Sequence, residues 1–299
     1  MTSLILIAAL QAVISVEAGL VNHVEGEVNV PVNENVPEGT PIRTGAGGYA
    51  EILLNPGSFL RLGAHSEAIL EGAELTDIRV RLVDGVAILE AAEIPEEFPI
   101  TVLTGNLRTS VIKDGIYKFG DGRATVLEGE LGVADLDLAW EKGWTIYFDR
   151  VYRAARAGSD APETNVERWS RTRAALLAEA NNRVYRSLLS TRNVVYPASL
   201  AEYWIWMPNV GSWAFFPMGR YQSPYGYRYR SSADLYRYLA QGRTRAGSTS
   251  GIGNPRPPST PGTPSTDSGS GGAGAPAPRA PAYSDIVPGK NGPGTQQPN

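Results

Sequence analysis

Apolar and polar positions alternate with a period of two along most of the first half of the chain. Between residues 20 and 148, short runs of this kind are separated by turn signals, as at Asp84-Gly85 after residues 78–82. Successive side chains of a strand point to opposite faces, so the alternation indicates strands with one buried face. Turns at intervals of about eight to twelve residues are typical of all-β units. Residues 19–149 are therefore predicted to form a mainly β domain, either a β-sandwich or a short-stranded β-solenoid.

Glycine marks the turns between these runs. Asn55-Pro56-Gly57 fits a type II turn, because proline fixes φ near the required value and glycine accepts a positive φ. The motif Val24-Glu25-Gly26-Glu27-Val28 returns as Leu127-Glu128-Gly129-Glu130-Leu131. Short units that begin at a glycine turn favour a stacked β-coil, and a plain sandwich remains the alternative.

After residue 149 the period changes, and residues 150–243 are predicted to form a helix followed by an extension rich in Trp and Tyr. The stretch Thr164 to Glu167 matches a capping box, in which Thr and Glu each satisfy a free backbone N–H of the other. The pattern then predicts a helix over residues 165–190 and a shorter one over 233–241. The first carries an apolar stripe, with its arginines off that stripe. The stripe and the arginines are, in turn, Val166, Trp169, Leu176, Leu177, Ala180, Val184 and Leu188, and Arg168, Arg171, Arg173, Arg183 and Arg186.

Both ends of the chain differ from this pattern. Residues 4–16 are apolar but too short to span a bilayer as a helix, and small residues precede a signal-peptidase site after Ala18. Residues 1–18 are thus predicted to be a signal peptide, with a buried first strand or helix as the alternative. Residues 244–299 are rich in Gly, Pro, Ser and Thr and predict a disordered tail. The protein is expected to be exported, periplasmic or associated with the cell surface, without a membrane span.

Charge is divided unevenly between the two halves. Residues 19–142 carry 21 acidic and 9 basic residues, whereas residues 143–299 carry 18 basic and 9 acidic ones. This asymmetry indicates self-association or an acidic partner for the second half, although solvated surfaces explain it too. The chain has no cysteine, which excludes disulfides, thiolate nucleophiles and Cys-ligated metals.

Candidates for chemistry are few. The two histidines, His23 and His65, have no metal-ligand spacing, and no nucleotide-binding motif follows a strand. We predict no catalytic residue, metal or cofactor. Carboxylates do occur in alternate pairs, and a glycosidase would need two of them to face each other across a cleft. The pairs are Glu25 and Glu27, Glu128 and Glu130, and Asp135 and Asp137. A carboxylate-based hydrolase is the second alternative function.

The aromatic extension is the strongest candidate for binding. Its rings lie among Pro and Gly and would either stack on sugar rings or docked chains, or anchor the extension on the β unit. The candidate binding residues are Trp204, Trp206, Trp213, Phe215, Tyr221 and Tyr225. A carbohydrate or cell-wall binding module is the first alternative function. Tyr and Arg interleave over residues 225–230, but the acidic first half and the expected export argue against nucleic acid.

The β region resembles the FecR-type domain of the iron-dicitrate sensor family. The resemblance rests on residues 24–30, 42–45, 49–54, 56–62, 82–87 and 116–119. With Arg168-Trp169-Ser170 and the aromatic tract, the chain looks like a secreted FecR-domain protein. The resemblance implies an all-β extracytoplasmic module without catalytic residues, which in sensor proteins relays receptor occupancy. We therefore predict a non-enzymatic binding or scaffold module at the cell envelope that contacts an envelope protein or glycan, with signal sensing and self-association as further expectations.

Overall fold

The described part of the chain is mainly β, as predicted. The computed structural model describes residues 12–13, 17–133, 136–158, 162–190, 203–207 and 210–247. All of these lie in the first of two compact units, Met1–Ser250, and the second is Gly251–Asn299. The tail was predicted over residues 244–299; its first four residues belong to a described helix that ends at Gly247, and the rest lies outside the described residues, as does the carboxylate Asp135.

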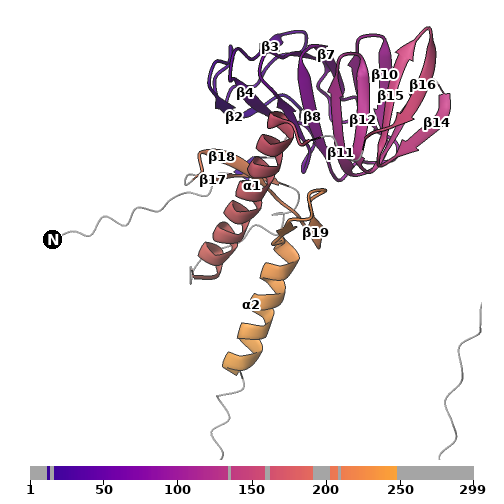
Figure 1. Cartoon of the computed structure of the whole chain (residues 1–299). Helices are drawn as coiled ribbons and strands as arrows, with labels where there is room; N and C mark the ends of the chain where they lie inside the picture. The colour runs from indigo at the N-terminus through magenta and orange to yellow at the C-terminus, as the bar shows by residue number, and fades with distance from the viewer. Residues whose placement is uncertain are drawn as a thin grey trace, which may run out of the picture. The chain divides into compact units, whose positions relative to one another are not determined.

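Two large sheets form the body of the first unit (Figure 1). All neighbours in the eight-stranded sheet are antiparallel, whereas the seven-stranded sheet contains one parallel pair, β7 with β9. The eight-stranded sheet has the order β16 (Val151–Arg156), β15 (Trp144–Asp149), β12 (Arg123–Glu128), β11 (Gly115–Gly120), β8 (Val86–Ala91), β5 (Phe59–Leu62), β4 (Tyr49–Leu53) and β2 (Val21–Glu25). The seven-stranded sheet has the order β14 (Leu136–Glu141), β13 (Glu130–Val133), β10 (Leu107–Val111), β9 (Ile100–Thr104), β7 (Arg79–Asp84), β6 (Glu67–Gly72) and β3 (Pro41–Arg43).

Successive hairpins alternate between the two sheets. The hairpins β4–β5, β11–β12 and β15–β16 belong to the eight-stranded sheet, and β6–β7, β9–β10 and β13–β14 to the other. The repeated Glu-Gly-Glu motif marks the corners at which the chain leaves the eight-stranded sheet, at Gly26 after β2 and at Gly129 after β12. Both glycines have positive φ, 65° and 93°. A Cβ on Gly129 would lie 2.3 Å from the hydroxyl of Tyr117, so this corner requires glycine.

One apolar core lies between the sheets and joins side chains from both. Ile52 and Leu62 come from the eight-stranded sheet and Ile42 and Leu70 from the seven-stranded one, and all four are fully buried. Two sheets that share one core form a sandwich, which is one of the two predicted architectures. The eight-stranded sheet extends through β16 to Arg156, past the boundary expected at residue 149.

The helix α1 (Asn165–Ser190) matches the range predicted for it and crosses the outer face of the eight-stranded sheet (Figure 1). Its N-terminus is the predicted capping box: the Thr164 hydroxyl contacts the Glu167 carboxylate at 2.7 Å, and the Thr164 backbone N–H donates to the same group. The extension adds the hairpin β17 (Tyr203–Met207) and β18 (Ser212–Phe216), the short pair β19 (Tyr221–Gln222) and β20 (Arg228–Tyr229), and α2 (Ser232–Gly247).

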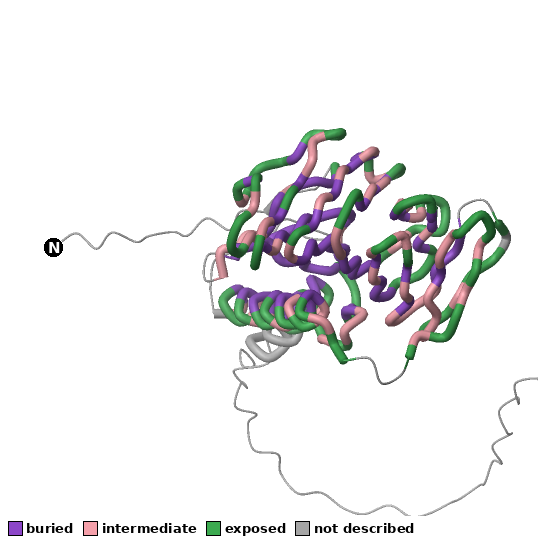
Figure 2. Tube along the Cα trace, turned by 45° about the horizontal axis from the view of Figure 1, so that its top comes forward, coloured by how far each residue is buried: buried purple, intermediate pink, exposed green. Residues whose placement is uncertain are grey.

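A second apolar core packs the extension against the eight-stranded sheet. It unites Phe59 of β5 with Leu177 and Val184 of α1 and with Trp204 and Phe215 of the β17–β18 hairpin. Strand β5 is consequently buried on both of its faces, as the continuous purple strands beside α1 show (Figure 2). Burial on both faces is what allows charged side chains of these strands to lie in the interior.

The N-terminal residues contribute one short strand, β1 (Ala12–Val13), which pairs with β17. These two residues lie inside the predicted signal peptide, and their pairing corresponds to the alternative of a first strand. The two described helices contain no segment long and apolar enough to cross a membrane.

Candidate functional site

Three charged side chains meet on the outer face of the eight-stranded sheet. Glu51 of β4 lies directly opposite Arg61 of β5 in the strand register, and Arg61 Nε donates to Glu51 Oε2 at 2.7 Å. Glu90 comes from the next strand, β8, and accepts from Arg61 Nη1 at 2.6 Å. Their neighbours along the strands face the sandwich core, so the period of two places these three on the opposite face, under α1.

Helix α1 adds a second cation to this group. Arg173 Nη2 donates to Glu51 Oε1 at 2.8 Å and to the hydroxyl of Ser212 on β18 at 2.9 Å. Ser170, one turn earlier on α1, accepts from Arg61 Nη1 at 3.0 Å. A spacing of three residues puts Ser170 and Arg173 on one helix face. That face of α1 therefore contacts both Arg61 of β5 and Glu51 of β4.

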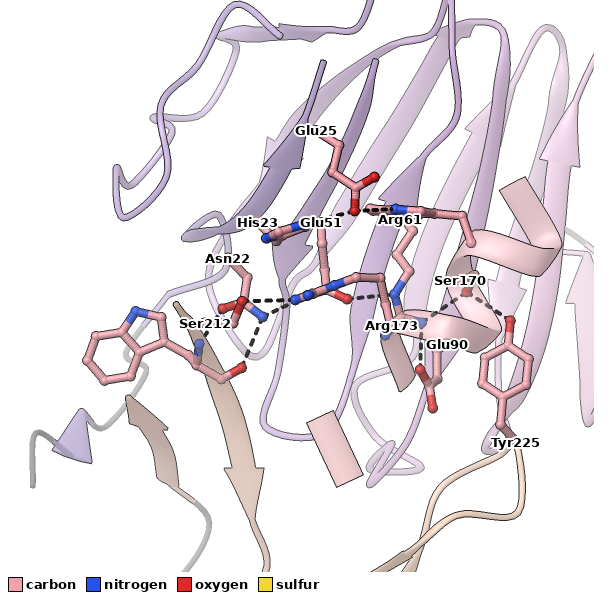
Figure 3. Close-up of polar contacts among 12 residues, drawn as sticks. Asn22, His23, Glu25, Glu51, Arg61, Glu90, Ser170, Arg173, Ser212 and Tyr225 are labelled. Carbon is pink, nitrogen blue, oxygen red and sulfur yellow. Dashed lines mark hydrogen bonds and ion pairs between the residues drawn. The ribbon is translucent and has the colours of Figure 1, made fainter. Parts of the chain in front are cut away.

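Two further residues connect the group to the extension. The Asn22 amide nitrogen donates to Glu51 Oε1 and to the carbonyl of Trp213, and the Asn22 oxygen accepts from the Trp213 N–H at 2.6 Å. The hydroxyl of Tyr225 donates to Ser170 Oγ at 2.8 Å. Figure 3 shows how these groups converge from the sheet, α1 and the extension. We call Asn22, Glu51, Arg61, Glu90, Ser170, Arg173, Ser212 and Tyr225 the junction cluster.

The four charged groups of the cluster are closed off from solvent. The side chains of Glu51 and Arg61 are 0% exposed, and those of Glu90 and Arg173 are 1% and 4% exposed. Two carboxylates face two guanidinium groups, so the cluster can be electrically neutral. A substrate cannot reach these groups in this arrangement, whereas the bonds between them join β4, β5, β8, α1 and β18.

The two carboxylates differ in their protonation equilibria. Burial alone would raise the pKa of Glu51, but the guanidinium groups of Arg173 and Arg61 outweigh it and lower that pKa to about 2. Burial raises the pKa of Glu90, and its attraction to Arg61 offsets this only in part. Burial also raises the pKa of Tyr225. Glu51 is thus the stable anion of the cluster, and Glu90 is the carboxyl that takes up a proton more readily.

The two carboxylates should give opposite pH dependences of stability. Because its pKa is lowered by folding, Glu51 stabilises the folded state above pH 4.5. This contribution, about 3 kcal/mol, is lost as the pH falls from 4.5 to about 2. A raised pKa means that Glu90 favours folding at low pH and loses this contribution as the pH rises above 4.5. Urea unfolding of Glu51→Gln and Glu90→Gln checks this. At pH 7 Glu51→Gln should be the less stable variant, and the gap between the two should close toward pH 2; equal stabilities at pH 7 would contradict the assignment.

The structure places most of the predicted binding residues in the second apolar core. Four of the six are buried, with exposed fractions of 1% to 8%: Trp204, Trp213, Phe215 and Tyr221. Their rings meet edge to face, at 6.0 Å between Trp204 and Phe215 and at 5.1 Å between Phe215 and Tyr221. Trp206 is partly buried against Trp213, and Tyr225 lies apart from them in the junction cluster. A sugar could not stack on the buried faces without displacing the extension.

Each described member of the paired carboxylates has a separate partner or an exposed position. Glu25 accepts from the Trp169 indole at 2.8 Å and contacts His23 at 3.1 Å. Glu128 pairs with Lys142 at 2.7 Å, and Glu130 pairs with Lys113. Glu27 is exposed, and the side chain of Asp137 is outside the description. His65 is exposed in a turn, as expected for a solvated side chain. Among the described residues, no group of three or more His, Asp or Glu is arranged to hold a metal ion.

A groove of about 790 Å³ runs along the outer face of β11, β12 and β15 beside the start of α1. Its carboxylates are all ion-paired, Glu128 with Lys142, Glu163 with Arg171 and Glu167 with Lys118. Burial would raise the pKa of Glu167, but hydrogen bonds from Thr164 and the charge of Lys118 lower it. A general acid needs a raised pKa, so Glu167 is poorly suited to that role.

Sequence reasoning did not identify the junction cluster. Arg173 was expected to lie off the buried stripe of α1 and is instead 3% exposed on the docking face, whereas Leu176 of the expected stripe is 40% exposed. The expectation was wrong because an arginine can be buried when it pairs with an acidic side chain. The partner of Arg173 is Glu51, which comes from a strand far away in the sequence. The available signal was a single charge inside each apolar strand, as in Phe59-Leu60-Arg61-Leu62.

The comparison with protein families agrees with the resemblance found in the sequence. Residues 40–131 match the family model described as FecR protein. Two solved structures of a proposed anti-sigma factor from Parabacteroides distasonis ATCC 8503 are 15% and 14% identical, with TM-scores of 0.33 and 0.34. Each alignment covers 40% of this chain and 61% of the other. No curated protein matches the chain.

Proposed function

We propose that this chain, which carries a FecR-type region at residues 40–131, is a non-catalytic scaffold that binds a protein partner at the cell envelope, outside the cytoplasm. The FecR resemblance implies an extracytoplasmic module, and the apolar residues 4–16 support export. Signal sensing is the finer form of the same proposal, in which binding of the partner is the signal.

The observation that carries the proposal is the place where ionisable side chains converge. They meet in the junction cluster, where Glu51 and Arg61 are fully buried and bonded to each other. An enzyme needs its reactive groups beside a cleft that admits substrate. Here the same groups join the extension to the sandwich, which leaves strand faces and edges as the surface available for contact.

Photocrosslinking in cells tests this proposal. A photoreactive amino acid is placed, one position at a time, at exposed residues of different strands: Val83 of β7, Arg108 of β10 and Val151 of β16. A scaffold should give a discrete protein adduct from one or more of these positions. Adducts to peptidoglycan alone would instead support the carbohydrate-binding alternative. Turnover in a broad hydrolase screen of the purified chain would contradict the non-catalytic assignment.

Export is tested separately by fusing alkaline phosphatase after residue 30, since that enzyme is active only outside the cytoplasm. Activity of the fusion is expected, and an inactive fusion that is present at normal levels would contradict export. Mass spectrometry of the exported full chain then shows whether residues 1–18 are removed or remain as the source of β1.

A further inference from the structure

The two edge strands of the eight-stranded sheet differ in how far their backbone groups are covered. At one end, residues 33–36 cover the edge strand β2: Val21 N–H donates to the Glu34 carbonyl at 2.9 Å, and Asn33 N–H donates to the Val21 carbonyl at 2.8 Å. At the other end lies β16, which pairs in the described structure only with β15 (Figure 1). A sheet edge that is left open is a template for another strand.

The register of β16 shows which of its backbone groups face outward. Ala157 N–H donates to the Gly143 carbonyl at 2.8 Å, and antiparallel strands alternate bonded and non-bonded pairs. Ala155 and Arg153 therefore bond to β15, while Tyr152, Ala154 and Arg156 turn their N–H and C=O groups away from it. All six pairs between β15 and β16 are in regular register, so no bulge interrupts the free edge.

Strand β14, an edge strand of the seven-stranded sheet, is less suited to strand addition. The pairing of β14 with β13 is interrupted by a register shift between Gly132 and Val133. A bulge of this kind increases the local twist and protects an edge. The regular strand β16 is the better template of the two.

Three arginines lie beside the free edge, on a face that also carries the exposed Asp149. Arg123 of β12, Tyr147 of β15 and Arg153 of β16 stand opposite one another in the register. They lie on the outer face, because Ile146, the residue before Tyr147 on β15, points into the sandwich core. Arg123, Arg153 and Arg150 in the adjoining turn are exposed, and none of them forms an ion pair with another described residue. Seven of the twelve described arginines and lysines of the sandwich do have such a partner.

We propose that β16 binds an acidic, extended segment of a partner protein as a ninth strand of the sheet, with Arg123, Arg150 and Arg153 neutralising its carboxylates. Added strands gain affinity from main-chain hydrogen bonds and specificity from alternate side chains. The positive charge disfavours pairing of β16 with β16 of a second copy, because that would bring arginines together. This inference rests on the proposed scaffold function and names the class of partner and the place where it binds.

The test measures binding of a fluorescent peptide to the purified full chain by anisotropy. The probe is a peptide of about ten residues that alternates glutamate with valine, which spans a typical strand. A peptide with lysine in place of glutamate is the comparison. The glutamate peptide should bind more tightly by about tenfold or more, and its affinity should fall as salt is added.

Two variants separate strand addition from simple charge attraction. Ala154→Pro removes an N–H that faces outward and leaves the bonds to β15 in place, and proline is tolerated on edge strands. Arg153→Glu reverses the charge of one of the three arginines. Each should weaken binding by about tenfold, with an unchanged circular dichroism spectrum and melting temperature. Arg108→Glu, which makes the same charge change at an exposed position of β10 in the other sheet, should bind within a factor of about two.

Full binding by Ala154→Pro would overturn the added strand, as would equal binding of the glutamate and lysine peptides. Sedimentation of the chain as a dimer that Ala154→Pro dissociates would assign the edge to a second copy and overturn the proposal too. If photocrosslinking yields protein adducts from β7 or β10 but none from β16, the scaffold function stands and this inference fails. The absence of protein adducts from every position would instead remove the scaffold function itself.

Discussion

Replacing Arg61 by methionine is expected to lower the free energy of unfolding by about 3–5 kcal/mol, because it removes the central cation of a buried group and leaves charges without a partner. Arg61 contacts Glu51, Glu90 and Ser170, and its side chain is 0% exposed. After the change Glu51 keeps Arg173, but Glu90 loses its ion-pair partner. Chemical denaturation at pH 7, followed by circular dichroism, measures the loss.

The matched control is Arg43→Met, the same substitution in an exposed ion pair. Arg43 donates to Glu67 at 2.8 Å with 56% of its side chain exposed, so its loss should lower the free energy of unfolding far less, because solvent screens an exposed ion pair. A second variant tests the cause: adding Glu90→Leu to Arg61→Met should recover part of the loss, because it removes the uncompensated carboxyl. Equal effects of Arg61→Met and Arg43→Met would show that the cluster does not hold the fold together.

The junction cluster also shows what the local sequence pattern can and cannot predict in this chain. The helix over residues 165–190 and its capping box were predictable because a helix start depends on neighbouring residues alone. The burial of Arg173 was not predictable, because it depends on Glu51, which lies 122 residues away in the chain. An arginine on a helix face is predicted to be exposed to solvent unless the surface that packs against the helix is known. Local pattern thus identified the helix and misjudged part of the face that docks.

The β region illustrates the same division. The turn at Asn55-Pro56-Gly57 joins β4 and β5 as predicted, with φ of 95° at Gly57. The repeat around Gly26 and Gly129 was recognised as a repeat, but its meaning as the corner between two sheets required the pairing of distant strands. The parallel pairing of β7 with β9 likewise has no local signal, because the chain passes through β8 of the other sheet between these two strands. Sequence therefore predicted the class of fold, and the sheet order came only from the structure.

Replacing Trp204 by alanine is the second change with a large expected effect, about 3–5 kcal/mol, because it opens a cavity in the core beneath the extension. Trp204 is 1% exposed and packs edge-on against Phe59 of β5 at 5.2 Å and against Phe215 of β18 at 6.0 Å. Its indole N–H has no hydrogen-bond partner among the described residues. Trp204→Phe keeps most of the packing and removes that unpaired donor, so it should cost much less. Denaturation followed by circular dichroism compares the two variants.

The two apolar cores predict where the damage appears. The core between the sheets does not include Trp204, which belongs to the core under the extension. In Trp204→Ala the extension should therefore become sensitive to limited proteolysis while a sandwich fragment survives. Trp144→Ala, at a partly exposed ring that contacts Arg156 on the sandwich, is the control and should leave the extension protected. Equal losses for Trp204→Ala and Trp204→Phe would contradict the packing role. If the expected result holds, a loss of glycan retention in a Trp204 variant would report an undocked extension and could not count as evidence for a sugar-binding site.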